Sequence, residues 1–139
     1  MSPAANESGN ERTVRRAGGH RVVLIDSITQ VRDADRGAIV VTGSHGGASS
    51  GHYAAAVRAA LYAFNDAGVG KDGAGIAALA ALDARGTAAV AVGHDTARIG
   101  SARETWECGV VRHANGAARA MGIRAGVALR DAMGALEQA

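Results

Sequence analysis

The residues best suited to chemistry lie in three glycine-rich loops, which span residues 42–52, 65–75 and 93–104. The polar side chains of these loops that are most suited to chemistry are Ser44, His45, His52, Asn65, Asp66, Lys71, Asp72, His94, Asp95, Arg98 and Glu104. Histidine and carboxylate groups can exchange protons near neutral pH, and lysine and arginine can hold an anion. The three loops therefore indicate acid–base chemistry on a small anionic molecule.

The first loop contains the segment GSHGG, in which Gly43, Gly46 and Gly47 surround Ser44 and His45. Glycine leaves backbone N–H groups unshielded, and such a loop before a helix can hold a carboxylate or an oxyanion. We predict that the four residues around His45 bind substrate and that His45 is the leading general acid or base. The alternative is a flexible turn that needs glycine for its backbone alone. The loop matches neither GxGxxG nor GxxxxGK[ST], so it is weak evidence for a nucleotide.

The second loop, NDAGVGKDGAG, contains Lys71, the only lysine beside fourteen arginines. Lysine offers a compact charge and can lose its proton when buried, so we predict a catalytic or anchoring role for Lys71. Asp66 directly follows a predicted strand and is expected to orient the base or act as a second acid or base, while Asn65 binds substrate. The alternatives are an ion pair of Lys71 with Asp66 or Asp72, and a turn-forming role for Asp66. Asp72 also replaces the Ser/Thr of a phosphate loop, which argues against a nucleoside triphosphate.

The third loop adds His94, Asp95, Arg98 and Glu104 as predicted substrate-binding residues. Arg98 could place its guanidinium on a substrate carboxylate, or it could form a surface ion pair with Asp95 or Glu104. His94 beside Asp95 could be an oriented general base or an ordinary loop pair. No short metal-binding motif such as HExxH is present, and we predict neither a metal nor a cofactor.

Three residues outside these loops are given structural roles. Cys108 is expected to be a small buried hydrophobe rather than a nucleophile paired with His45. Trp106 is expected in the core or at an interface, and His113 at the surface or in core packing.

The apolar pattern predicts the elements that position the loops. Four strands are expected, at residues 22–25, 38–42, 61–66 and 87–92. Helices are expected at residues 52–61, capped by Ser49 or Ser50, and at 74–86, with Gly86 as C-cap. The C-terminal third reads as helical. The alternative for ECGVVRH is a strand closed by a turn at Asn115 and Gly116.

Strands that alternate with helices indicate an α/β fold, which we predict to be a small three-layer Rossmann-like domain with a mostly parallel sheet. Right-handed crossovers would place all three loops at the carboxyl edge of the sheet, where ligands bind in such folds. Residues 20–139 are expected to form this single domain, and the polar residues 1–19 a disordered tail.

Composition limits the partners. Hydrophobic residues make up 47% of the 139 residues but aromatic residues only 3%, so the core must come from small aliphatic side chains and a homo-oligomer is expected. The net charge is +2, and no basic cluster with interleaved aromatics indicates nucleic acid. A single cysteine, no apolar run of eighteen residues and no secretory segment favour a cytoplasmic protein without a membrane partner.

The sequence thus predicts a small cytoplasmic hydrolase or lyase that acts on a carboxylate- or amide-type anionic substrate. The alternative is a non-catalytic subunit of a larger complex that binds a nucleotide, a phosphate or a carboxylate through the same loops.

Overall fold

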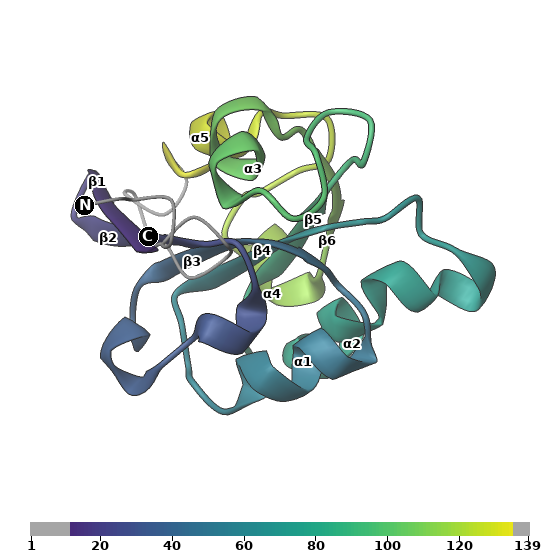
Figure 1. The fold of residues 1–139 in the computed structure, drawn as a ribbon, viewed down its shortest axis with the longest axis horizontal. Coiled ribbons are helices and arrows are strands. Elements are labelled where there is room, and N and C mark those ends of the chain that lie inside the picture. Colours follow the sequence, from purple (N-terminus) through teal and green to yellow (C-terminus); the bar gives the residue numbers. More distant parts are fainter. Residues whose placement is uncertain (1–11, 135–139) are drawn as a thin grey trace, which may run out of the picture.

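A six-stranded mixed sheet forms the centre of the computed structural model, which describes residues 12–134 (Figure 1). The strands are β1 (Arg12–Ala17), β2 (His20–Ile25), β3 (Ile39–His45), β4 (Leu61–Asn65), β5 (Ala89–Val92) and β6 (Val111–Ala114). The helices of this part are α1 (Ala48–Ala55), α2 (Ala77–Asp83), α3 (Ala102–Cys108), α4 (Gly116–Ala120) and α5 (Leu129–Ala132). None of these helices is long and apolar enough to span a membrane. The predicted α/β class and the mostly parallel sheet are confirmed.

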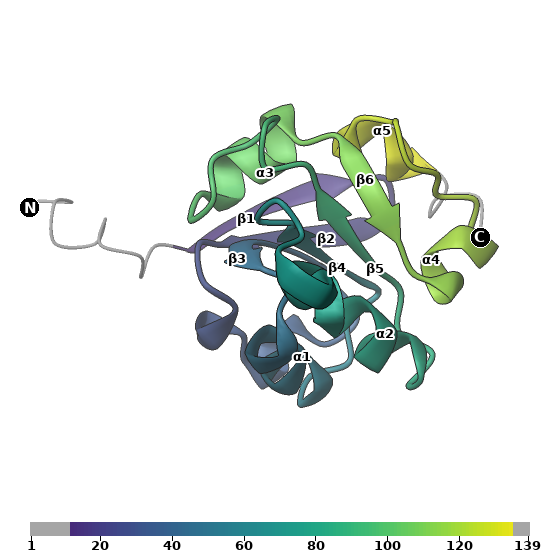
Figure 2. The same ribbon diagram turned by 90° about the vertical axis from the view of Figure 1, so that its right-hand side faces the viewer.

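The strand order follows the order of the sequence. Strands β2 to β5 are parallel, and β1 and β6 pair antiparallel at the two edges of the sheet. Since parallel crossovers are right-handed, a sequential order places the connections between β2 and β5 on one face. Helices α1 and α2 lie on that face, and the chain after β5 returns to cover the other with α3 and α5 (Figures 1 and 2).

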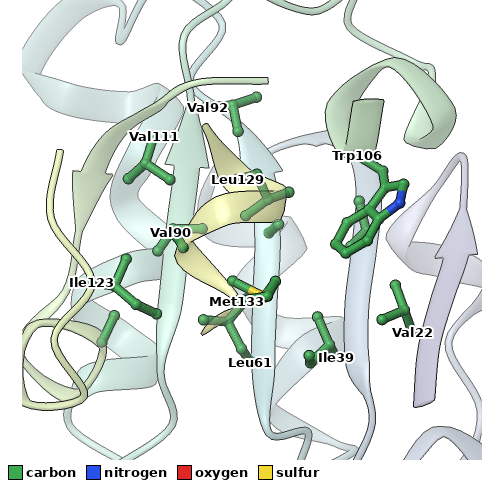
Figure 3. Close-up of a cluster of buried hydrophobic side chains, with 14 of the residues drawn as sticks. Val22, Ile39, Leu61, Val90, Val92, Trp106, Val111, Ile123, Leu129 and Met133 are labelled. Atoms are coloured by element: carbon green, nitrogen blue, oxygen red, sulfur yellow. The ribbon is translucent and has the colours of Figure 1, made fainter. Parts of the chain in front are cut away.

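The core has two halves, because successive strand residues point to opposite faces of the sheet. Val23, Val40 and Phe64 belong to the cluster beneath α1 and α2. The other cluster packs against α3 and α5 (Figure 3). Its members include Val22, Ile39, Leu61, Val90, Val92, Trp106, Val111, Ile123, Leu129 and Met133. Trp106 is therefore a core residue.

Strand β1 corrects the prediction of a disordered tail through residue 19. Arg12–Ala17 pairs with β2 through a two-residue turn at Gly18 and Gly19, and Gly18 has a φ of +59°. The Arg12 guanidinium also lies 2.6 Å from the carboxylate of buried Asp35. The hairpin turn and this ion pair hold a strand whose own side chains are mostly polar. Residues 1–11 lie outside the described part of the chain.

The helices are shorter than the sequence indicates. Helix α1 begins after Gly47 rather than at Ser49 or Ser50 and ends at Ala55, six residues before the predicted end. The hydroxyl of Ser50 donates instead to the carbonyl of His45, at 2.6 Å. Helix α2 starts only at Ala77, because the preceding residues 71–76 form a kinked 3-10 helix.

The segment after residue 101 also differs from the predicted helices. ECGVVRH is divided between the end of α3 and strand β6, so the strand alternative is correct for its second half. Cys108, predicted to be buried, is exposed at the end of α3. Helix α3 buries Trp106 and Thr105, and this leaves Cys108 on the solvent side.

Candidate functional site

The parallel strands β3, β4 and β5 end side by side, along what we call the carboxyl edge of the sheet. The loops that follow these strands are in contact. The N–H of Gly46 donates to the carbonyl of Asn65 at 3.1 Å, which joins the first loop to the second. The side-chain amide of buried Asn65 donates to the carbonyl of Ala97 at 2.9 Å, which joins the second loop to the third. The N–H of Gly100 donates to the carbonyl of Gly43 at 2.7 Å. The predicted convergence of the three loops is therefore present.

Asp66, the residue after β4, is the most highly connected carboxylate of this edge. Its Oδ1 accepts from the backbone N–H of Gly68 at 2.8 Å and of His94 at 3.0 Å, and it lies 3.2 Å from Nδ1 of the His94 ring. Its Oδ2 lies 3.6 Å from Nε2 of His113. The Asp66 side chain is only 7% exposed. A single buried carboxylate thus lies within reach of two imidazole rings.

The surroundings of Asp66 decide its charge. Burial by itself would raise the pKa of this carboxyl group, but the hydrogen bonds from the Gly68 and His94 N–H groups and from the His94 ring outweigh it, and the net pKa is lowered. Asp66 is therefore ionised at neutral pH. It can orient an imidazole and stabilise its protonated form, but it does not supply a proton.

His94 has the geometry of an oriented base. With Nδ1 as the protonated nitrogen that donates to Asp66, the neutral ring leaves Nε2 as a free acceptor. The side chain is 61% exposed, so Nε2 is accessible to a dissolved molecule. The expected partner of His94 was Asp95. That carboxylate lies instead 3.3 Å from the Arg112 guanidinium on β6.

His113 joins the cluster because β6 contains a bulge. Ala91 pairs with His113 but Val92 pairs with Val111, so Arg112 is an extra residue in the ladder. The bulge places Arg112 beside Asp95 and puts His113 on the same face as Ala91, toward α2. Sequence reasoning missed His113. The only available signal was the strand alternative for ECGVVRH.

A groove of about 530 Å³ opens next to this cluster, between α2 and the segment from β6 to the loop after α4. Helix α2 packs on β5. The lining residues are Ile76, Leu79, Ala80, Asp83, Arg112, His113, Ala114, Asn115, Gly116, Arg119, Arg124 and Ala125. His113 lies both on the groove wall and against Asp66, so the carboxylate–imidazole cluster adjoins the groove.

The backbone donors of GSHGG are already engaged. The N–H of Gly43 donates to the carbonyl of Asp26 at 3.1 Å, and the N–H of Ser44 donates to the hydroxyl of Thr42 at 3.2 Å. The N–H of Gly46 donates to the carbonyl of Asn65, and the N–H of Gly47 donates to Nδ1 of His45, both at 3.1 Å. The hydroxyl of Ser44 accepts from the N–H of Ile28 at 2.9 Å. This loop therefore joins strands and neighbouring loops, and His45 is exposed with one ring nitrogen used by its own loop.

The remaining predicted residues lie at the surface of the same edge. Arg98 is 80% exposed and lies 4.0 Å from the carboxylate of Glu104, so it forms the surface ion pair that was the alternative expectation. Lys71 is exposed. Within residues 12–134 its ammonium group makes no ion pair or hydrogen bond, and neither Lys71 nor His45 contacts Asp66.

The glycine-rich second loop has an unusual backbone. Ala67, Val69 and Asp72 join its glycines at positive φ, and the value of +70° at Val69 is strained for a β-branched residue. The N–H groups of Ala67 and Gly68 donate to the side chains of Asn65 and Asp66. This tight path keeps the loop folded over the end of β4 and fixes the Asp66 carboxylate.

Comparisons with protein-family models, with curated proteins and with solved structures found no match.

Proposed function

We propose that the protein is a small hydrolase or lyase that acts by general acid–base catalysis on a carboxylate- or amide-type anionic substrate. The observation that carries this proposal is the buried Asp66 carboxylate, which holds Nδ1 of His94 and leaves the opposite ring nitrogen exposed. The proposal assumes a three-layer Rossmann-like arrangement with the ligand beyond the carboxyl ends of the parallel strands. It also places the protein in the cytoplasm as a homo-oligomer.

In this mechanism His94 is the general base, the role predicted for His45 from the residue types. Nε2 of His94 removes a proton from a bound water in hydrolysis, or from the substrate in elimination. The charge of Asp66 stabilises the imidazolium that results and keeps the ring in place. The substrate carboxylate is held by arginines of the groove beside the cluster. His45, Lys71 and Arg98 stay proposed contributors at the outer rim of the site.

A non-catalytic binding subunit is the second candidate. It is favoured by the arginines that line the groove, because holding an anion requires no proton transfer. In that case the Asp66 cluster would serve to fix the loops and β6.

The test measures turnover of a panel of amides and hydroxy carboxylates by the full chain and by His94→Gln and Asp66→Asn. We expect each variant to lose about a hundredfold or more in kcat, because proton transfer by a positioned side chain contributes about that much. The matched control is His52→Gln, which changes an exposed histidine on α1 and should leave kcat unchanged.

Two results would contradict the proposal. Equal turnover by His94→Gln and the wild type would remove His94 as the base. Ligand binding without turnover of any panel member, and with the same affinity in His94→Gln, would establish the binding subunit instead.

A further inference from the structure

The groove between α2 and β6 combines an apolar floor with a concentration of positive charge. Ile76, Leu79, Ala80 and Ala114 supply aliphatic surface. Three arginines and a single aspartate, Asp83, are its fully charged residues. The Asp83 carboxylate also accepts a hydrogen bond from the N–H of Ala117, at 2.7 Å. One of its two oxygens is therefore hydrogen-bonded to the first turn of α4.

Two of the arginines have no acidic partner in the described part of the chain. Arg112 lies 3.3 Å from Asp95, but no carboxylate of residues 12–134 lies within ion-pair distance of Arg119 or Arg124. Each is held by backbone instead. Arg119 donates to the carbonyl of Ala114, and Arg124 donates to the carbonyl of Arg119 at 3.1 Å.

Those backbone contacts orient the guanidinium groups and leave donors free. A guanidinium has five N–H donors, of which each contact uses one or two. Groups that are already oriented lose less conformational freedom on binding, which favours affinity. The volume of about 530 Å³ lies within the range of pockets for small molecules.

We propose that this groove binds a small monocarboxylate with an apolar body. The carboxylate contacts Arg119 and Arg124, and the apolar body covers Leu79, Ala80 and Ala114 and extends toward His113. This inference names the substrate class of the proposed function, and it places the body of the substrate beside the Asp66 cluster. Binding itself requires neither His94 nor Asp66.

The test titrates the full chain with 4-phenylbutyrate in a calorimeter and compares 4-phenylbutanamide, which has the same body without the charge, and 3-phenylpropylphosphonate. We expect the carboxylate to bind at least tenfold more tightly than the amide, because a charge-assisted pair to arginine is lost. Arg119→Gln and Arg124→Gln should each weaken carboxylate binding about threefold or more. Ala80→Phe, which fills the groove from an exposed position on α2, should abolish it.

Two controls separate this site from general charge and from catalysis. Arg103→Gln removes an exposed arginine on α3, which lies on the opposite face of the sheet, and should change the affinity less than twofold. Asp66→Asn should keep the affinity within about threefold while turnover falls. Binding in Asp66→Asn without any turnover by the wild type would therefore contradict the proposed function alone.

Four results would overturn the groove assignment. The first two are no binding of 4-phenylbutyrate at millimolar concentration and equal affinity for the acid and the amide. The third is an unchanged affinity for 4-phenylbutyrate in both Ala80→Phe and the arginine variants. The fourth is a loss of affinity in Arg103→Gln equal to the loss in those variants. Tighter binding of the phosphonate than of the carboxylate would replace the carboxylate by a phosphate-type ligand.

Discussion

At the residue scale, Asp66 shows how hydrogen bonds at the carboxyl end of a strand can keep a buried side chain ionised. One carboxylate oxygen accepts two backbone N–H groups and lies beside the ring of His94, while the other lies near His113. The hydrogen bonds from Gly68 and His94 favour the ionised form, and together they outweigh the burial of the side chain, so the pKa of Asp66 is lowered. The charge of Asp66 is therefore linked to the stability of the fold.

The first prediction follows from that link. Because the pKa of Asp66 in the folded protein lies below its ordinary value of 3.8, its charge stabilises the fold above about pH 5. The contribution is lost as the pH falls through the folded-state pKa. Asp66→Asn should cost about 1–2 kcal/mol at pH 7, and the difference from the wild type should shrink as the pH falls below 3.8. Urea unfolding across this pH range measures it, and a constant difference at every pH would contradict it.

Part of this site was predictable from residue types. Asp66 and His94 follow apolar strand runs, so their place at the carboxyl edge could be inferred. The partner of His94 could not, because it depends on the tight backbone path from Asp66 to Gly68. His113 was missed for a related reason, since one extra residue at Arg112 decides which face His113 occupies. Apolar periodicity does not reveal a one-residue bulge.

At the element scale, β1 depends on interactions outside its own strand. Arg12 bridges from β1 to Asp35, which is 1% exposed, and also donates to the carbonyl of Gln30 at 2.7 Å. The sequence could not show this contact, because the two charges are 23 positions apart. The Gly18–Gly19 pair is a hairpin-turn signal in the sequence, but the prediction of a disordered tail used only the polar composition and did not consider it.

The second prediction concerns this ion pair. Arg12→Ala leaves the buried Asp35 carboxylate without its counter-charge and should lower the free energy of unfolding by about 2–3 kcal/mol. Arg16→Ala, at an exposed position of the same strand, should change it by less than about 0.5 kcal/mol. Urea denaturation compares the two. Equal effects would show that Arg12 contributes no more than an ordinary surface arginine.

The third prediction tests the contact between the first and third loops. A Cβ on Gly43 would overlap the backbone of Gly100 and Ser101, which cannot move aside like a side chain. Gly43→Ala should therefore cost about 2 kcal/mol or more. Gly19→Ala, where no atom beyond the two chain neighbours lies within 4 Å of the added carbon, should stay within about 1 kcal/mol. A similar thermal shift for both variants would mean that the loops are not held together at Gly43.

At the scale of the whole molecule, the two core clusters share one sheet, so neither face can lose its packing without affecting the other. Leu82 on α2 is 1% exposed in one cluster, and Leu129 on α5 is fully buried in the other. Trp106, the only tryptophan, lies in the cluster of Leu129 and reports on that face. A cooperative domain should therefore unfold in a single transition.

The fourth prediction uses that reporter. Leu82→Ala and Leu129→Ala should each cost about 2–5 kcal/mol. Both should shift the Trp106 fluorescence transition and the circular dichroism transition to the same lower urea concentration. A Leu82→Ala variant whose circular dichroism changes before its fluorescence would show that the two faces unfold separately.

The sequential strand order has a consequence for biosynthesis. A ribosome delivers β2 to β5 and the helices of one face first, while Leu129 and Met133, which close the opposite face, emerge among the last described residues. Until then α3 covers this face without α5, and incompletely covered apolar surface is recognised by chaperones and promotes aggregation. The apolar face of the sheet is therefore fully covered only after translation has passed residue 133.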